Sequence, residues 1–270
     1  MSEISDLVGI ESRGQVLKYS NQFYDLQTSD FGVNDWRILF AILYYSQSGI
    51  DYDEAKITIP TDELKNALNW KKSHKLFIDT FYKSFQKIVG LQTTRRDEND
   101  EKYLILNLFS RADITDQKTI IKLNKDLAEE FFKDLAENFT MISLQAVLKI
   151  GDSKATINLF FRLQRFIDTG KWIVSFADFK KIFGLEKIKD SDIVKKYIEP
   201  SVESLKYKLP YIYSNLRYEF ESNNSHLKGK KNKKSLLVFY YQNPAVFANN
   251  IKKKEKEVID DLSDVDLEQG

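Results

Sequence analysis

One stretch, residues 171–209, limits the fold more than any other part of the sequence. Residues 172–174 predict a short strand, and the apolar residues of 176–183 then recur at helical spacing. Ser191 is predicted to cap a second helix, 192–206, whose apolar residues lie on one face. An ordinary amphipathic pair of helices fits this stretch equally well, so the fold depends on the residues C-terminal to it.

The residues after this stretch favour a DNA-binding fold. Residues 211–220 and 236–241 predict two strands. The connection between them is strongly basic and carries Lys228, Lys230, Lys231, Lys233 and Lys234. A strand, two helices and a basic hairpin in this order predict a winged helix. In that fold the second helix enters the major groove of DNA, and the hairpin, called the wing, reaches the backbone or the minor groove.

The same order of elements is predicted in the first half of the chain. A strand at 56–59 precedes a helix that begins at Pro60, a second helix begins near Ser73, and residues 91–96 and 102–109 form a hairpin. We therefore predict an α+β fold with two tandem winged-helix domains related by internal duplication. The alternative, that any two helical segments align by their apolar residues, stays open because identities between the halves are few.

The predicted domain limits follow from these elements. Residues 1–15 are expected to be a flexible arm, 16–123 the N-terminal winged-helix domain and 124–251 the C-terminal winged-helix domain. Residues 139–149, inside the second domain, are predicted to be helical. The charged residues 252–270 lack aromatic side chains and are expected to be a disordered tail.

Composition narrows the class of protein. A chain of 270 residues with 42% hydrophobic residues is long enough and apolar enough to build real cores. Without cysteine it has no disulfide framework and no thiolate nucleophile. No apolar run reaches membrane-spanning length and no signal peptide is recognisable, so we expect a soluble cytoplasmic protein without a membrane partner. The net charge of +1 means that any contact with DNA rests on local basic patches.

Polar and basic residues near the predicted second helices are the candidate DNA contacts. The first set opens the second helix of the first domain, where a helix N-terminus also attracts phosphate, and consists of Lys71, Lys72, Ser73, His74 and Lys75. The second set belongs to the second domain and consists of Lys187, Lys189, Ser191, Lys195 and Lys196. The alternative for each set is an ordinary solvated surface.

Arginines and the wing lysines complete the candidates. The lysines of the second wing are expected to contact phosphates and to set affinity more than sequence preference. Arg95 and Arg96 are expected to do the same on the first wing, but the acidic residues of 97–101 make an interface strand an equal alternative. Arg162 and Arg165 fit either contact with the DNA backbone or pairing within the domain.

Enzymatic chemistry finds little support in the sequence. A nicking enzyme of the rolling-circle type needs two neighbouring metal-binding histidines and a tyrosine nucleophile, whereas His74 and His226 are far apart in the sequence. No G-x-x-x-x-G-K-[ST] motif is present to hold nucleotide phosphates. We expect no catalytic residues, no metal site and no cofactor.

Four segments of the sequence are distinctive: Asn-Phe-Thr at 138–140, the helix at 153–163, Thr-Gly-Lys-Trp at 169–172 and the run from Ser191-Asp192 to Glu199-Pro200. In these segments the chain resembles the Rep_3, or RepB-type, family of initiators of iteron-based theta replication in plasmids. The similarity covers roughly residues 16–242. The chain departs from its relatives at Asn158, where they usually carry arginine, and at Val194, where they continue a basic run.

The resemblance implies a function. Members of this family bind repeated sites, called iterons, in double-stranded DNA at a plasmid origin, open the AT-rich duplex beside them, and recruit a host initiator protein and the replicative helicase. The resemblance also implies a dimer through the N-terminal domain that represses its own promoter. A winged-helix transcription regulator without initiator activity is the alternative, and a protein-interaction scaffold built on winged helices is a third.

Overall fold

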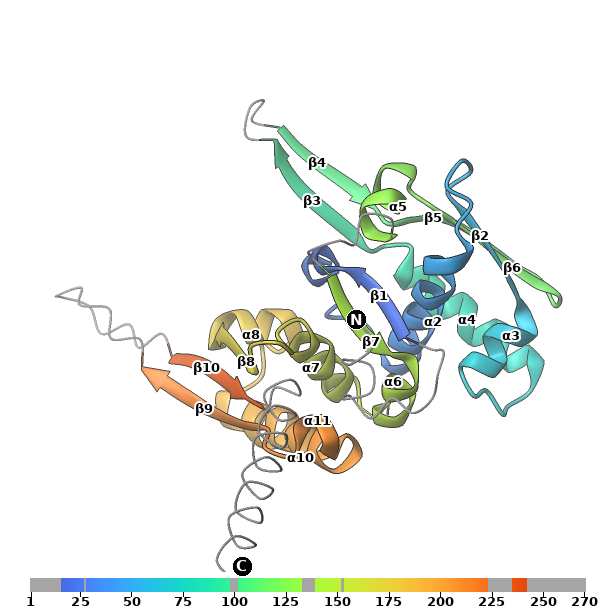
Figure 1. The fold of residues 1–270 in the computed structure, drawn as a ribbon. Coiled ribbons are helices and arrows are strands. Elements are labelled where there is room, and N and C mark those ends of the chain that lie inside the picture. Colours follow the sequence, from blue (N-terminus) through green and yellow to red (C-terminus); the bar gives the residue numbers. More distant parts are fainter. Residues whose placement is uncertain are drawn as a thin grey trace, which may run out of the picture.

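The computed structural model describes residues 16–26, 28–97, 102–132, 139–151, 153–222 and 235–241. The predicted arm (1–15) and tail (252–270) lie outside this described part. The chain forms two groups of helices and strands, and α2 (Val33–Gly49), α6 (Leu144–Ile150) and α7 (Lys154–Gln164) lie between them (Figure 1). The mixture of helices and strands confirms the α+β class. Within the described residues, no helix combines the length and apolarity needed to cross a membrane.

The first strand has a partner far along the sequence. β1 (Val16–Ser20) pairs antiparallel with β7 (Phe139–Ser143), and the 3₁₀ turn η1 (Asn21–Asp25) follows β1. The helix predicted from residue 139 is therefore wrong over the residues of β7. Thr140 and Ile142 alternate inward as strand residues do, and the hydroxyl of Ser143 then accepts the N–H of Ala146 (3.3 Å) to begin α6.

The pairing of β1 with β7 also crosses the predicted boundary between residues 123 and 124. β1 belongs to the first predicted domain and β7 to the second. The two domain limits stay a prediction, and the core of the first group extends across that boundary. Phe131 of α5 (Lys125–Phe132), for example, packs edge-on against Phe23 of η1 with ring centroids 5.1 Å apart.

The first group contains the predicted strand and helix pair. They are β2 (Lys56–Pro60), α3 (Thr61–Ala67) and α4 (His74–Ile88). The predicted hairpin is present as β3 (Gln92–Asp97) and β4 (Lys102–Asn107), an isolated two-stranded sheet that projects from the molecule (Figure 1). β2 pairs with β6 (Lys118–Leu123), which pairs with β5 (Phe109–Ile114). The sequence pattern did not indicate β5 as a separate strand.

The second group repeats the order of strand, helix pair and hairpin. β8 (Lys171–Ser175) is followed by α8 (Phe176–Phe183), then by the continuous helical run α9 (Asp190–Ile193), η2 (Val194–Ile198) and α10 (Glu199–Lys208). β9 (Arg217–Ser222) and β10 (Ser235–Tyr240) form the hairpin, and the sheet order is β8-β10-β9. The predicted strand over 211–220 is wrong in its first part, because Pro210 begins the short helix α11 (Pro210–Tyr213).

The two groups differ in which strands pair in their sheets. In the second group the strand before the helix pair, β8, joins the hairpin strand β10. In the first group β2 joins β6 instead, and the hairpin β3–β4 remains a separate sheet. The internal duplication therefore stays a prediction that rests on element order alone.

The long helix of the second group contains one wider turn. η2 is a π-helical segment, and the N–H of Glu199 donates to the carbonyl of Val194, five residues earlier. Pro200 follows immediately and has no N–H to donate, so the wider turn accommodates it without ending the helix. The prediction that Ser191 caps this helix is wrong. The helix begins at Asp190, two residues before the predicted start at Asp192, and the N–H groups of Asp192 and Ile193 donate to the carbonyl of Lys189.

Two buried tyrosines bond to α7: Tyr213 of α11 and Tyr241, which directly follows β10. The phenol of Tyr241 donates to the carbonyl of Leu163 (2.6 Å), and the amide of Gln164 donates to the phenol oxygen of Tyr213 (2.7 Å). Burial raises the pKa of both phenols above the ordinary value for tyrosine. Both therefore stay neutral at physiological pH and serve as hydrogen-bonding core residues.

Gly184 is a glycine whose replacement we expect to destabilise the protein. It ends α8 in the left-handed conformation (φ +66°), and an added Cβ would lie 3.3 Å from the carbonyl oxygen of Ser29. We expect Gly184→Ala to lower the free energy of unfolding by roughly 1–2 kcal/mol. Gly49→Ala is the matched control, because no atom lies within 4 Å of its added Cβ, and chemical denaturation should show no loss. Equal stability of the two variants would contradict this prediction.

Candidate nucleic-acid interface

The start of α4 is well fixed and exposes several lysines. The hydroxyl of Ser73 accepts the N–H of Leu76 (3.3 Å) and so caps the helix, which was predicted to begin near this residue. Phe77, Phe81, Phe85 and Ile88 anchor the opposite face of α4 in the core. Lys71, Lys72 and Lys75 are exposed around the capped end. These exposed lysines therefore flank the N-terminus of a helix, an arrangement suited to phosphate.

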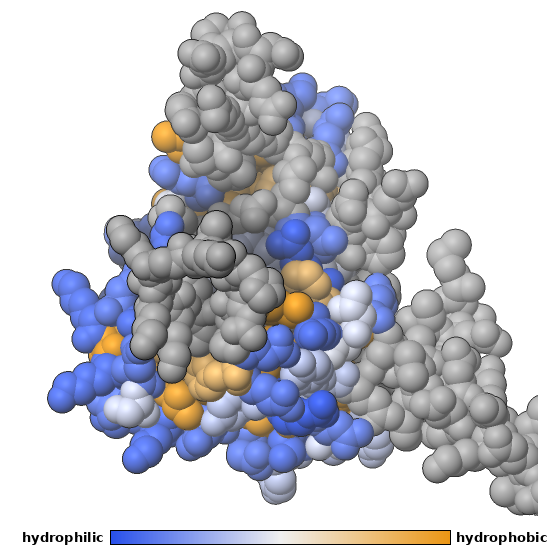
Figure 2. Space-filling model, turned by 90° about the vertical axis from the view of Figure 1, so that its left-hand side faces the viewer, coloured by the Kyte–Doolittle hydropathy of each residue, from blue (hydrophilic) through white to orange (hydrophobic). Residues whose placement is uncertain are grey.

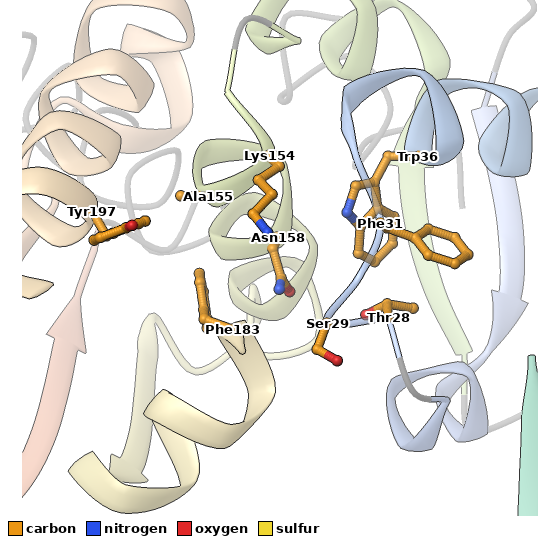
Figure 3. A pocket seen from close by; sticks show the side chains of 9 residues that line it. All are labelled: Thr28, Ser29, Phe31, Trp36, Lys154, Ala155, Asn158, Phe183 and Tyr197. Atoms are coloured by element: carbon orange, nitrogen blue, oxygen red, sulfur yellow. The ribbon is translucent and has the colours of Figure 1, made fainter. Parts of the chain in front are cut away.

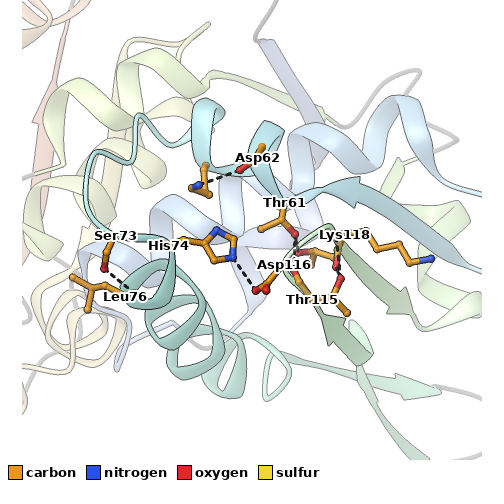
Figure 4. Close-up of polar contacts among 10 residues, drawn as sticks. Thr61, Asp62, Ser73, His74, Leu76, Thr115, Asp116 and Lys118 are labelled. Carbon is orange, nitrogen blue, oxygen red and sulfur yellow. Dashed lines mark hydrogen bonds and ion pairs between the residues drawn. The ribbon is translucent and has the colours of Figure 1, made fainter.

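His74 plays a different part from the lysines beside it. Its Nε2 lies 3.0 Å from a carboxylate oxygen of Asp116, in the turn between β5 and β6 (Figure 4). Two hydrogen bonds hold that turn, because the hydroxyl of Thr115 accepts the N–H of Lys118 (3.0 Å) and the hydroxyl of Thr61 donates to the carbonyl of Thr115 (2.9 Å). The contact with His74 therefore ties the start of α4 to the neighbouring sheet.

The second helical run exposes the second candidate set. Ile193, Ile198, Val202 and Leu205 are buried and hold the run against the core. On the outer side the exposed candidate residues are Lys187, Lys189, Ser191, Lys195 and Lys196. The structure therefore places this set at the start of the helix run and in the residues just before it. The set on α4 belongs to the other group.

Carboxylates temper the positive charge of this second set. Asp190 forms an ion pair with Lys180 (3.0 Å), and Asp192 forms one with Lys196 one helical turn later (3.3 Å). Both pairs are at the surface, where such pairs contribute little to stability. Lys196 can therefore exchange its carboxylate partner for a phosphate at small cost in folding free energy.

The wing candidates are described only in part. Arg95 and Arg96 lie on β3, opposite Leu104 and Tyr103 of β4. The lysines of the second wing (Lys228, Lys230, Lys231, Lys233 and Lys234) lie outside the described residues, between the end of β9 and the start of β10 in the sequence. Their contact with DNA stays a prediction.

Arg162 of α7 is buried, whereas Arg165, the residue that follows α7, is exposed. The guanidinium of Arg162 is buried, donates to the carbonyl of Tyr24, and lies over the rings of Tyr24 (5.7 Å) and Phe161 (5.5 Å). The guanidinium of Arg165 lies over the Tyr24 ring at 5.3 Å. Arg162 is thus paired inside the protein, and not within its own predicted domain, because its partner Tyr24 belongs to the first predicted domain.

Sequence reasoning missed the aromatic junction between the two groups. The Phe161 ring stacks on Tyr24 (4.3 Å between centroids) and contacts Trp36 (5.0 Å) and Phe40 (5.6 Å). These side chains come from η1, α2 and α7. The only signal in the sequence was the density of aromatic residues, which does not say which rings meet.

A small cavity lies at the edge of this junction (Figure 3). Its lining comes from both groups and comprises Thr28, Ser29, Phe31, Trp36, Lys154, Ala155, Asn158, Phe183 and Tyr197. The space inside is about 10 Å³, roughly enough for one water molecule and far too small for a nucleotide. The cavity therefore does not provide a cofactor site.

The surface on the side of the second group is mainly hydrophilic. Figure 2 shows that side, where hydrophilic residues predominate and hydrophobic ones form small separate patches. Large continuous apolar surfaces usually mark obligate protein contacts or membrane contacts. The described surface in this view suits a charged partner better.

Comparisons with known proteins agree with this geometry. The family model of the initiator replication protein, WH1, matches residues 16–164. No curated protein sequence matches the chain. A solved structure of the Pi initiator protein in complex with iteron DNA has 12% sequence identity and a TM-score of 0.61, and the similarity covers 84% of this chain and 96% of that chain. Domains 2–3 of RctB match at 12% identity with a TM-score of 0.44, over 77% of this chain and 82% of that chain.

The likeness to the Pi initiator protein concerns the fold, because the identity is low. The family match is broader evidence, since it extends over more than half of the 270 residues. It begins at β1 and continues through α7, so it includes the first helix pair, the first hairpin and the pairing of β1 with β7. The chain therefore belongs to the family of initiator replication proteins.

Proposed function

We propose that this protein initiates plasmid replication by binding repeated sites, the iterons, in double-stranded DNA. The observation that carries the proposal is the exposure of lysines near the start of the second helix in both groups of elements. In a winged helix that end of the second helix meets the base edges of the major groove. The family of the chain and the iteron complex of the Pi initiator protein support the same assignment.

Each group has a defined role in this proposal. α4 and the run from α9 to α10 enter successive major grooves, and the candidate residues at their starts contact phosphates and base edges. The second-wing lysines and the arginines of β3 contact the backbone beside them. Because the aromatic junction joins the groups in one core, both helices act on the same DNA with fixed spacing. The two groups correspond to two tandem winged-helix domains that arose by duplication.

Further roles follow from the family. We infer that the protein opens the AT-rich duplex beside the repeats and recruits the host initiator protein and the replicative helicase in the bacterial cytoplasm. We also infer a dimer through the N-terminal domain that binds the protein's own promoter and represses it. In this proposal the protein acts by binding DNA and carries out no covalent chemistry.

The test is a binding titration of the full chain. The probe is the DNA that flanks the gene, compared with unrelated DNA of equal length at two salt concentrations. We expect tighter binding to the flanking DNA, by a factor of about 10³ or more, and a footprint over direct repeats. Equal, weak and steeply salt-dependent binding to both DNAs would contradict iteron recognition.

A second measurement separates an initiator from a transcription regulator. Permanganate oxidises unstacked thymines, so an initiator is expected to make thymines reactive in the AT-rich tract beside the footprint on supercoiled DNA. A regulator that only occupies its promoter would protect the site and leave those thymines unreactive.

A further inference from the structure

Leu76 is an apolar side chain in an unusual place. It is the third residue of α4 and is 42% exposed, although its neighbour Phe77 is buried. The buried stripe of α4 continues through Phe81, Phe85 and Ile88, and Leu76 lies about 100° around the helix from it. The core therefore gains little from a leucine at this position.

The surroundings of Leu76 are cationic. Lys72 and Lys75 are both exposed beside it, and Lys71 is exposed just before them. The hydrogen bond from the N–H of Leu76 to the hydroxyl of Ser73 fixes its backbone at the capped end of the helix. An exposed apolar side chain next to exposed lysines in the sequence complements a polyanion that presents an apolar group between its phosphates.

We propose that Leu76 contacts the C5-methyl group of a thymine in the major groove and so contributes to sequence recognition by α4. A leucine side chain can neither donate nor accept a hydrogen bond, and the thymine methyl is the only apolar group on the major-groove edges of the base pairs. The lysines hold the backbone on either side of that base, and Leu76 selects it. This inference rests on the proposed function, because it requires α4 to enter a major groove.

The test removes one methyl group at a time from the DNA. The full chain is titrated with the duplex defined by the footprint, in which each thymine is replaced in turn by deoxyuridine. We expect one position at which the replacement weakens binding by about fourfold, the amount for one buried methyl-sized group. Leu76→Ala should weaken binding to the thymine duplex and should abolish the difference between thymine and deoxyuridine at that position.

Two further variants keep the result interpretable. Leu76→Met retains an apolar side chain of similar volume and should keep the sensitivity to the methyl group. Ile173→Ala removes another exposed aliphatic side chain (52% exposed) from β8, outside α4, and should leave the sensitivity at that thymine unchanged. Because Leu76 is outside the buried stripe, the denaturation curve of Leu76→Ala should match that of the unmodified protein.

The failure of this inference differs from the failure of the proposed function. If Lys72→Gln weakens binding but Leu76→Ala is as sensitive to deoxyuridine as the unmodified protein at every position, Leu76 does not read a thymine and the DNA-binding role of α4 stands. If Lys72→Gln and Leu76→Ala both bind as the unmodified protein does, α4 does not enter the groove and both proposals fall.

Discussion

Replacing Phe161 by alanine is expected to lower the free energy of unfolding by about 3–5 kcal/mol. The side chain is 1% exposed on α7, and its ring contacts Tyr24 of η1 and Trp36 and Phe40 of α2. Alanine leaves a cavity that these large rings cannot fill. The Arg162 guanidinium also loses one of the two aromatic rings that it lies over. Chemical denaturation followed by tryptophan fluorescence measures the loss.

Two comparisons make this result specific to the junction. Phe161→Leu keeps much of the volume and should lose clearly less stability. Tyr207→Ala removes an aromatic side chain that is 85% exposed and should change stability by no more than about 0.5 kcal/mol. If Phe161→Ala were no less stable than Tyr207→Ala, the junction would not belong to the cooperative core and the two groups would not be rigidly joined.

Replacing Lys72, Lys75, Lys195 and Lys196 together by glutamine is expected to weaken DNA binding by about a thousandfold near physiological salt. Each lysine that neutralises one phosphate contributes about 0.9 to the slope of log K against log salt. At ~0.15 M salt this contribution corresponds to about a fivefold change in DNA-binding affinity per lysine. The salt slope should therefore become shallower by about 3.6. A titration of the footprint duplex at several salt concentrations measures both quantities.

The control changes the net charge equally but elsewhere. Lys56, Lys122, Lys125 and Lys149 belong to β2, β6, α5 and α6, outside the two proposed groove-facing helices. Their joint replacement by glutamine should alter the affinity much less. A loss as large as that of the first variant would mean that overall charge, and not the start of the two helices, governs binding.

Local sequence signals predicted the elements that depend on local physics. The spacing of Phe77, Phe81 and Phe85 indicated the buried face of α4, and Ser73 was correctly placed at its start. Asn124, a residue type typical of helix starts, directly precedes α5, and its side-chain oxygen accepts the N–H of Asp126 at 2.9 Å. In each case the signal and the structure it predicts lie within a few residues.

Local sequence patterns predicted the wrong element where a partner far along the chain determines the structure. The helix predicted at residue 139 is instead β7, because β1 supplies its hydrogen-bonding partner. The start of the helix at Asp190 and its π turn depend on backbone bonds that the residue pattern does not reveal. Tyr213 was assigned to a strand because of its aromatic character, yet it is a buried helical residue that hydrogen-bonds to Gln164.

The sequence predicted which charged residues belong to the candidate site, but it did not predict their contacts. The structure finds the candidate lysines of both helices exposed, and their contact with DNA remains a prediction. The ion-pairing partner of His74 comes from a turn that follows the hairpin β3–β4, so no local pattern linked it to Asp116. The burial of Arg162 was equally hidden, because a basic residue on a helix usually indicates an exposed surface.

The pairing of β1 with β7 has a consequence for the order of folding during synthesis. β1 leaves the ribosome first, but its hydrogen-bonding partner is complete only when Ser143 has emerged. Until then the backbone groups of one edge of β1 have no strand to bond, and the loop to be closed contains α2, α3, α4 and two hairpins. Contacts of such long range slow folding. The first group of elements therefore reaches its final form only after Ser143 has been made, more than half of the way along the 270 residues.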